Sequence, residues 1–326
     1  MKHTVKKTVV IALSALTLAS SASALNVSAD ADNTVHVIVK NERLSVADGA
    51  PWTGTLIDTQ ATLNADDSIE TLVERVIKAN GFEFTVSDYG YISSVNNLAE
   101  YAYNGSGGWM TTLNDWFTSE GTIGYTVENG GLKAGDEIVM MYSCSWGADV
   151  GSLYGNFDTS LQALSVDGGS LTQAFVPSQK DFTLLIDSAE TAVTVVPEAY
   201  NKNYQVRMYC NVYLPVSNAQ LPYKQAVSVK DGDTLYIGIG NPAWPTMNSW
   251  AGTADGTVYT LQVKTRPFGD LSGNGSVGIE DATLLQRYLA EYVTFDAAMQ
   301  ARADIDNDGD ITINDVTTLQ RMIAEF

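Results

Sequence analysis

Two short segments near the end of the chain space their oxygen-bearing side chains as a calcium-binding loop does. They start 34 residues apart, and each carries such side chains at loop positions 1, 3, 5, 7 and 12, with glycine at position 6. Calcium is a hard cation that prefers several oxygen ligands, and glycine permits the sharp turn that aims alternate side chains at one centre. The sequence therefore predicts two Ca2+ sites. Their predicted ligands are Asp270, Ser272, Asn274, Ser276 and Asp281 in the first loop, and Asp304, Asp306, Asp308, Asp310 and Asp315 in the second.

A helical pattern follows each of these loops. Apolar residues recur at helical spacing in residues 282–289 and again in residues 316–323, so each helix has one face to bury. Pro267 and a strand-like run precede the first loop, which leaves no room for a helix that enters it. Each unit is therefore predicted to be a loop followed by one helix, and the two units together form a small all-α domain.

The duplicated loop and helix, half of an EF-hand in each copy, resembles the type I dockerin domain over about the last sixty residues, 268–326. The resemblance implies a domain that folds on two Ca2+ ions. It also implies docking onto a cohesin module of a scaffold, as in cellulosome-like or amylosome-like complexes. Because the two copies are nearly identical, it implies that either helix could face the cohesin after a half-turn. The residues that match the cohesin-contacting positions of dockerins are Ile279, Glu280, Gln286, Arg287, Ile313, Asn314, Gln320 and Arg321.

The first loop departs from the pattern at two ligand positions. Ser272 and Asn274 stand there, whereas the second loop has Asp306 and Asp308 at the equivalent positions. The first site therefore has fewer negative ligands. Because the charge of the ligands tunes calcium affinity, we expect the first site to bind calcium more weakly than the second.

The start of the chain has the pattern of a secretory signal. Three lysines precede a short apolar run at residues 9–18, and residues 22–24 fit a cleavage site. The predicted signal is residues 1–24, or 1–29 if a second candidate site is cut. The apolar run is shorter than the roughly twenty residues that span a bilayer, and no later stretch is longer. We therefore expect an exported protein without membrane insertion, held at the cell surface through its scaffold.

The composition limits the possible partners. The chain has 18 Lys+Arg against 38 Asp+Glu and a net charge of -20, which argues against nucleic acid because phosphate binding requires a basic face. Its length and apolar content indicate more than one folded domain. The two cysteines, Cys144 and Cys210, lie in different predicted domains. Export permits a disulfide between them, but two buried free thiols are favoured.

Residues 33–150 are predicted to form an α+β domain. Strand-like runs at 34–39, 54–63, 82–86, 108–113 and 137–142 surround one helix, and the expected sheet is mostly antiparallel. The helix is expected to start at an Asp67 N-cap with Glu70 three residues later and to end at Gly81. Residues 104–110 and 132–137 resemble the C-terminal domain of transcobalamin-type proteins. In relatives of that family the domain covers one side of a corrinoid, so the resemblance implies a corrinoid-like ligand as an alternative.

Residues 157–266 are predicted to form a β-sandwich. Short alternating runs separated by turn residues fill this segment, with no helical pattern. The opening at 161–171 and the run at 194–197 resemble bacterial cadherin-like sandwich repeats, which implies a spacer or binding module. The long aromatic segment at 240–252 departs from a plain spacer.

Several aromatic residues lie in or beside turns rich in glycine, asparagine and serine. Rings exposed on such turns are suited to stacking on the apolar faces of sugars. The alternative is that the rings close a small core, which is the commoner fate of any single tryptophan. The candidate ligand-binding residues are Trp52, Tyr103, Trp109, Trp116, Trp146, Trp244 and Trp250.

No motif of a catalytic site emerges from the sequence. His36 is the one histidine after the predicted signal, and no Gly-x-Ser-x-Gly motif is present. We therefore predict a non-catalytic secreted subunit that docks through its C-terminal domain and binds polysaccharide such as starch or a plant cell wall glycan. The alternatives are an adhesion or structural component, a small-ligand (corrinoid-like) binding component, and an enzyme acting on glycosides through a carboxylate pair.

Overall fold

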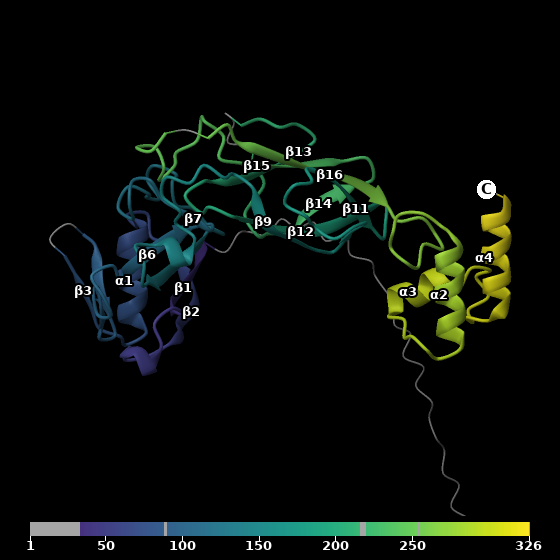
Figure 1. Cartoon of the computed structure of the whole chain (residues 1–326), viewed down its shortest axis with the longest axis horizontal. Helices are drawn as coiled ribbons and strands as arrows, with labels where there is room; N and C mark the ends of the chain where they lie inside the picture. Colours follow the sequence, from purple (N-terminus) through teal and green to yellow (C-terminus); the bar gives the residue numbers. More distant parts are fainter. Residues whose placement is uncertain (1–32, 88–89, 216–219, 253, 326) are drawn as a thin grey trace, which may run out of the picture.

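The computed structural model describes residues 33–87, 90–215, 220–252 and 254–325. The predicted secretory signal, whether it ends at residue 24 or 29, lies outside the described residues. Figure 1 shows the chain as three groups of elements in succession: strands around one long helix, then packed β-strands, then helices. None of the described helices is long and apolar enough to cross a membrane.

We name the three groups by their residues. The N-terminal region is residues 33–150, the sandwich region is residues 157–266, and the C-terminal region is residues 268–325. Each has its own cluster of buried hydrophobic side chains. The chain is mostly β in its first two regions, and its last region is helical.

The main sheet of the N-terminal region has five strands in the order β2-β1-β8-β6-β7. The interior strand β1 buries every second residue, and Val35, Val37 and Val39 are fully buried. β1 and β8 are parallel, and the other pairs are antiparallel, so the expected mostly antiparallel sheet contains one parallel pair. The strands are β1 Thr34–Asn41, β2 Gly54–Thr62, β6 Gly108–Leu113, β7 Trp116–Phe117 and β8 Glu137–Ser143.

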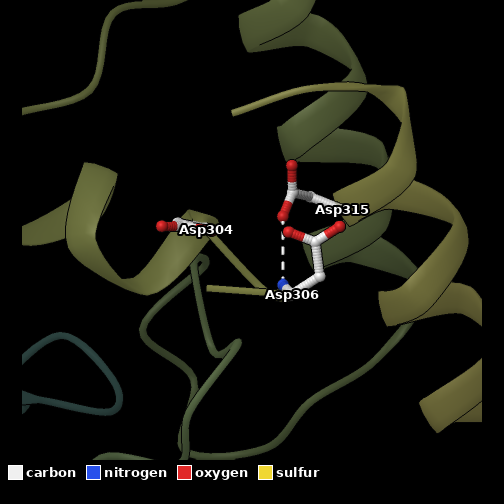
Figure 2. Close-up of side chains that lie close together, drawn as sticks. All are labelled: Asp304, Asp306 and Asp315. Atoms are coloured by element: carbon white, nitrogen blue, oxygen red, sulfur yellow. Dashed lines mark hydrogen bonds between the residues drawn. The ribbon is translucent and has the colours of Figure 1, made fainter. Parts of the chain in front are cut away.

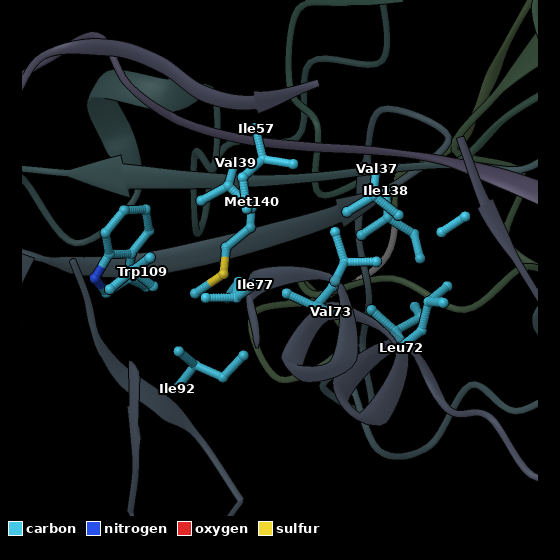
Figure 3. Close-up of a cluster of buried hydrophobic side chains, with 14 of the residues drawn as sticks. Val37, Val39, Ile57, Leu72, Val73, Ile77, Ile92, Trp109, Ile138 and Met140 are labelled. Carbon is cyan, nitrogen blue, oxygen red and sulfur yellow. The ribbon is translucent and has the colours of Figure 1, made fainter. Parts of the chain in front are cut away.

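The helix α1, Ile69–Ala79, covers one face of this sheet. Its apolar stripe, which includes Leu72, Val73 and Ile77, packs against β-strand side chains in the core (Figure 3). The expected Asp67 N-cap is wrong by one residue, because the Ser68 side chain caps the helix in a capping box with Thr71. Asp67 instead pairs with Arg75, at 2.5 Å from its Nη2.

The remaining short elements of the N-terminal region flank this layer. A second sheet has the order β3-β4-β5, and two short 3-10 helices lie in the connections. The strands are β3 Phe84–Val86, β4 Ile92–Val95 and β5 Leu98–Ala99, and the 3-10 helices are η1 Val46–Asp48 and η2 Ala148–Val150.

The sandwich region consists of two sheets, as the strand pattern predicted. The larger has the order β10-β11-β16-β15-β13 and the smaller β14-β12-β9, with the apolar faces of both in one core. The strands are β9 Leu161–Asp167, β10 Ser170–Leu171, β11 Asp181–Ile186, β12 Glu190–Ala199, β13 Val206–Cys210, β14 Val227–Lys230, β15 Thr234–Ile239 and β16 Thr257–Thr265.

The N-terminal and sandwich regions share a polar contact. The indole Nε1 of Trp116 donates to the carbonyl of Asn203 at 3.1 Å, and the amide of Phe117 donates to the carbonyl of Lys202 at 2.8 Å. The Lys202 ammonium also forms a salt bridge with Asp115. Trp116 is therefore part of the junction between the two regions.

The C-terminal region has three helices: α2 Ile279–Leu289, α3 Ala297–Ala303 and α4 Ile313–Glu325. α2 and α4 follow the two predicted loops and start three residues before the expected stretches. They pack together through Ala282, Leu285, Val316 and Leu319. The short α3 between them was not expected. The Asp296 side chain caps it by accepting the amide of Met299 at 2.7 Å.

The two cysteines are not bonded to each other in the structure. Cys144 lies just after β8 and Cys210 ends β13, so they belong to different regions. Burial raises the pKa of both thiols, and this opposes thiolate formation.

Candidate calcium and docking site

The second loop brings three carboxylates together. Oxygens of Asp304, Asp306 and Asp315 lie within 4.8 Å of one another (Figure 2). Asp304 follows the end of α3, and Asp315 is the third residue of α4, so the ends of two helices bring these carboxylates near each other. Among the described residues, no lysine or arginine forms an ion pair with any of them. Three like charges at this spacing favour a bound cation.

Backbone amides fix the position of Asp315, which is fully buried. Its Oδ1 accepts the amide of Ile305 at 2.7 Å and that of Asp306 at 3.2 Å, and its Oδ2 accepts the amide of Thr312 at 2.7 Å. Burial alone would raise the pKa of Asp315, but these hydrogen bonds outweigh it and hold the pKa below its usual value. The carboxylate at loop position 12 is therefore charged and oriented.

The neighbouring Asp306 has the opposite shift. Partial desolvation, and then repulsion by Asp308, Asp315 and Asp304, raise the pKa of Asp306. A group whose charged form is opposed by nearby charges gains most from a divalent cation among them. Asp308 and Asp310 are exposed and lie outside the group of three, with the Asp308 Oδ1 accepting the amide of Asp310 at 2.9 Å.

The first loop has the same internal hydrogen bonds with fewer charges. Asp270 accepts the amides of Gly273 and Gly275 at 2.8 and 3.0 Å, as Asp304 accepts those of its own loop. Asp281 accepts the amides of Ser272 and Gly278, both at 2.7 Å. Both aspartates are fully buried. The loop therefore offers two oriented carboxylates where the second loop offers three.

The uncharged ligands predicted in the first loop are turned toward other partners. The Asn274 Nδ2 donates to Glu280 Oε1 at 2.5 Å, and the Asn274 Oδ1 accepts from Ser276. The Ser272 hydroxyl donates to Asp270 Oδ1 at 3.3 Å. The donor sets of both loops consist of oxygens, which suits a hard cation such as Ca2+, and the second loop suits it better because its carboxylates already converge.

The predicted cohesin-contacting side chains are all exposed in both copies. Ile279 and Ile313, which open α2 and α4, have the same exposed fraction of 64 %. Two large apolar side chains held in water at equivalent positions of a duplicated unit are typical of interaction surfaces. The exposed set is Ile279, Glu280, Gln286, Arg287, Ile313, Asn314, Gln320 and Arg321.

The predicted sugar-binding aromatics divide by burial. Trp109, Trp116 and Trp244 are at most 6 % exposed, and each uses its indole N–H to bond a backbone carbonyl. None of these three rings is exposed on the outer surface, so their assignment as surface platforms for a sugar is corrected to core and junction roles. Trp52 is half-buried and stacks on Trp109, with ring centroids 6.0 Å apart.

The remaining candidates are open to solvent. Trp146 is 70 % and Trp250 is 91 % exposed, and Tyr103 is exposed as well. Tyr101 lies edge-on to Trp146 at 6.4 Å between ring centroids, and both residues have positive φ, at 60° and 51°. This backbone conformation is unfavourable for bulky side chains, and it recurs at ligand-binding positions.

Comparison with known families gives one match. Residues 268–324 match the model of the dockerin type I domain, so the C-terminal region is a type I dockerin domain. Such a domain implies a cohesin partner, and type I dockerins typically bind calcium. The comparisons do not support the expected likenesses of residues 33–150 to transcobalamin-type domains and of residues 157–266 to cadherin-like repeats. No curated protein matches the chain.

Proposed function

We propose that the protein is a non-catalytic subunit that docks, through a Ca2+-dependent C-terminal region, onto a cohesin of a scaffold and contributes polysaccharide binding to the complex. The observation that carries the docking role is the dockerin match over residues 268–324 together with the convergent carboxylates of the second loop. Calcium would neutralise the aspartates of each loop and join the loop to its helix. The exposed Ile279 and Ile313 ends would then be held rigid for a partner.

Docking is tested with the full chain. Binding to a panel of immobilised cohesin modules is measured in calcium and again after chelation with EGTA. We expect one or more cohesins to retain the protein in calcium and to release it on chelation. Retention that is indifferent to EGTA, or no retention by any cohesin of the panel, would contradict the proposal.

Export belongs to this proposal, because a cohesin scaffold that gathers polysaccharide-binding proteins works outside the cell. The basic and apolar pattern of residues 1–24 supports it. N-terminal sequencing of the protein recovered from culture medium tests it. A mature end at residue 25 or 30 is expected, and an intact Met1 on the recovered protein would contradict export by this signal.

A non-catalytic role is supported by the environment of the residues that would carry nucleophilic chemistry. His36 Nε2 lies 2.6 Å from Asp58, and its Nδ1 lies 3.3 Å from Glu137, so both ring nitrogens are engaged. The raised pKa values of Cys144 and Cys210 disfavour the thiolate form. Release of reducing sugar from a polysaccharide above the blank would contradict this part of the proposal.

The polysaccharide platform we propose is the exposed pair Tyr101 and Trp146, with Tyr103 beside them in sequence. Ser106 and Asn104 hydrogen-bond the carbonyl of Cys144, at 2.9 and 3.2 Å, and so tie the two aromatic turns together. A rigid pair of exposed rings can stack on successive sugars with little loss of conformational entropy.

Sedimentation with insoluble starch, cellulose and xylan tests the platform. We expect Trp146→Ala to abolish binding to the glycan that retains the wild type. The matched control is Tyr292→Ala, which removes another exposed ring, 78 % exposed, from the C-terminal region. Equal losses in the two variants, or a wild type that binds none of these glycans, would contradict the platform.

A further inference from the structure

A cavity opens beside β6 and is lined by residues of the N-terminal region together with Met247 of the sandwich region. The short β7 pairs only with Thr112 and Leu113, so residues 109–111 have no strand on that side. The cavity that adjoins them has a volume of about 410 Å3, within the rough range of 300–1,000 Å3 that is common for small-molecule sites. It is separate from the calcium loops and from the exposed aromatic turns.

The walls of this cavity are largely apolar and aromatic. They include Trp109 of β6, Ile92 of β4, Met140 of β8 and Val73 of α1. Figure 3 shows these four side chains gathered between the helix and the strands. Tyr91 adds a further ring, which is fixed because its hydroxyl accepts the amide of Trp109 at 2.8 Å. Four different elements therefore hold the walls in place.

One carboxylate lies in these walls without a partner. Glu70, the second residue of α1, is only 5 % exposed, and no donor among the described residues bonds its buried Oε2. The carboxylate lies against the backbone of Gly90, where an added Cβ would be 2.8 Å from Oε1. Burial of a carboxylate oxygen without a hydrogen-bond donor costs free energy. A ligand that supplies the missing donor would remove this cost.

Helix stability alone does not account for this glutamate. An acid in the first turn interacts favourably with the helix dipole, but an exposed acid gains the same benefit while it remains hydrated. Here burial, and then repulsion by Glu74, raise the pKa of the Glu70 carboxyl, so the site opposes the charge that the dipole favours. The described lining residues include a second acid, Glu120 at the exposed rim, and no lysine, arginine or histidine.

We propose that this cavity binds a small organic cation, in which an ammonium group is accepted by Glu70 and an apolar body packs among Tyr91, Trp109 and Met140. An ammonium group supplies the missing donor and neutralises the buried carboxylate in one contact. The aromatic rings beside it add cation–π attraction. An anion of the same shape is repelled by both glutamates, and a neutral ligand leaves the charge uncompensated. This site is independent of the docking function.

The test uses three probes of equal shape with the full chain. These are 2-phenylethylamine, 2-phenylethanol and phenylacetate, each titrated by calorimetry and by tryptophan fluorescence at pH 7. We expect the amine to bind with a Kd on the order of 1 mM or tighter, as suits so small a ligand. The alcohol should bind at least about 10-fold more weakly, the difference expected for a charge-assisted hydrogen bond, and the carboxylate should not bind.

Two variants distinguish a specific effect of the Glu70 carboxylate from a general effect of removing one negative charge. Glu70→Gln keeps the shape of the side chain and removes its charge, and it should weaken amine binding by at least about 10-fold. Glu128→Gln removes an exposed carboxylate of the N-terminal region that does not line the cavity, and it should change the Kd by less than about 2-fold. Equal binding of amine and alcohol, undiminished amine binding by a folded Glu70→Gln variant, or no amine binding at 10 mM, roughly ten times the expected Kd, would each overturn the proposal.

Discussion

The two calcium loops share their spacing and their internal hydrogen bonds, but they lie in different surroundings. A Cβ placed on Gly275 of the first loop would be 3.2 Å from Thr172 of the sandwich region, so this loop lies against a neighbour. The equivalent Gly309 of the second loop has nothing within 4 Å. The first loop therefore packs against the sandwich region at this position, whereas the second loop has no neighbouring atoms at the equivalent position.

The contacts around the first loop extend to a small ionic cluster. Arg266, just before the loop, pairs with Asp187 at 2.9 Å and donates to the Ser170 hydroxyl at 2.6 Å. Arg302 of α3 reaches the same Asp187 at 3.0 Å. The Arg302–Asp187 pair joins the C-terminal region to the sandwich region, and Arg266 also lies against the first loop, where a Cβ on Gly273 would be 2.7 Å from its Nη1. The order of the first loop therefore depends partly on protein contacts.

From this comparison we infer that charge and packing contribute differently to the order of the two loops. The second loop has three carboxylates close together and nothing within 4 Å of a Cβ placed on Gly309, so we expect a bound ion to contribute much of its order. The first loop has two carboxylates and packs against the sandwich region. We expect the second site to bind calcium more tightly, and the first site to depend on the sandwich region.

The largest effect is expected for variants of the two predicted cohesin-binding faces. They test whether the two faces bind cohesin equally well although the two loops have different neighbours. Changing Gln286 and Arg287 to alanine, or Gln320 and Arg321 to alanine, should each alter cohesin affinity by less than about 3-fold, because the other face remains. Changing all four should weaken binding by about 100-fold or more, as loss of a central contact cluster does. Surface plasmon resonance measures both. A large loss from one pair alone would show that the faces are not interchangeable.

The next effect concerns the two metal sites themselves. Calcium titration of the full chain should resolve two dissociation constants that differ by about 10-fold, because the second loop has more anionic ligands. Asp304→Asn should remove the tighter site and Asp270→Asn the weaker one. The matched pair of variants assigns each constant to a loop. Loss of the weaker constant in Asp304→Asn would reverse the order that we infer.

Glu70, like Asp281 and Asp315, is a buried acid in the first turn of a helix, so the three can be compared. Asp281 and Asp315 are buried and accept backbone amides, whereas Glu70 is buried without such donors. The pKa of Glu70 is higher in the folded chain than in the unfolded chain, where it is about 4.3. Its contribution to the stability of the fold is therefore greatest below that pH and is lost as the pH rises and the buried carboxyl ionises. Glu70→Gln should therefore raise the free energy of unfolding at pH 7 by about 1 kcal/mol, with a smaller gain at pH 4.

Urea denaturation at the two pH values measures this difference. Glu128→Gln, which removes an exposed carboxylate away from Glu70, serves again as the control and should change the free energy of unfolding little at either pH. Destabilisation at pH 7 by Glu70→Gln, with the control unchanged, would mean that the native carboxylate has a favourable partner that its surroundings do not indicate.

The smallest effect is expected for a variant that removes contacts between the sandwich region and the first loop. Arg266→Ala removes the contacts with Asp187 and Ser170 and should weaken calcium binding at the first site by about 3-fold, since the ion pair is partly exposed. The second site should be unchanged. Arg287→Ala, which removes an exposed arginine of α2, is the control for charge. Equal weakening of both sites by Arg266→Ala would contradict a local role for the sandwich region.

The calcium loops could be predicted from the sequence because their geometry is local. The ligands of each loop lie within twelve consecutive positions, and the glycine at position 6 determines how the chain turns. The longer strands of the first two regions were also recognisable from their alternation, as in β1 and β15, whereas the short strands β4, β5, β7 and β14 were not expected. The α1 cap was off by one residue because Asp67 and Ser68 are both capable caps, and the contact with Arg75 engages Asp67 elsewhere.

The aromatic residues show where local pattern stops being informative. Trp109 and Trp146 both lie beside glycines and serines in sequence, yet one is 3 % and the other 70 % exposed. Trp116 is buried because its indole reaches Asn203, 87 positions further along the chain. Burial depends on which distant segment covers a side chain, and a turn pattern carries no such information.

The sequence by itself determined the two loops, their spacing and the duplicated helices, because neighbouring residues set the geometry of a short loop. Only the tertiary structure decided that one loop lies against the sandwich region, that three of six tryptophans are buried, and that Glu70 lines an apolar cavity. These features arise where segments far apart in the chain come together. Packing between such segments determines exposure, electrostatic environment and the space left for a ligand.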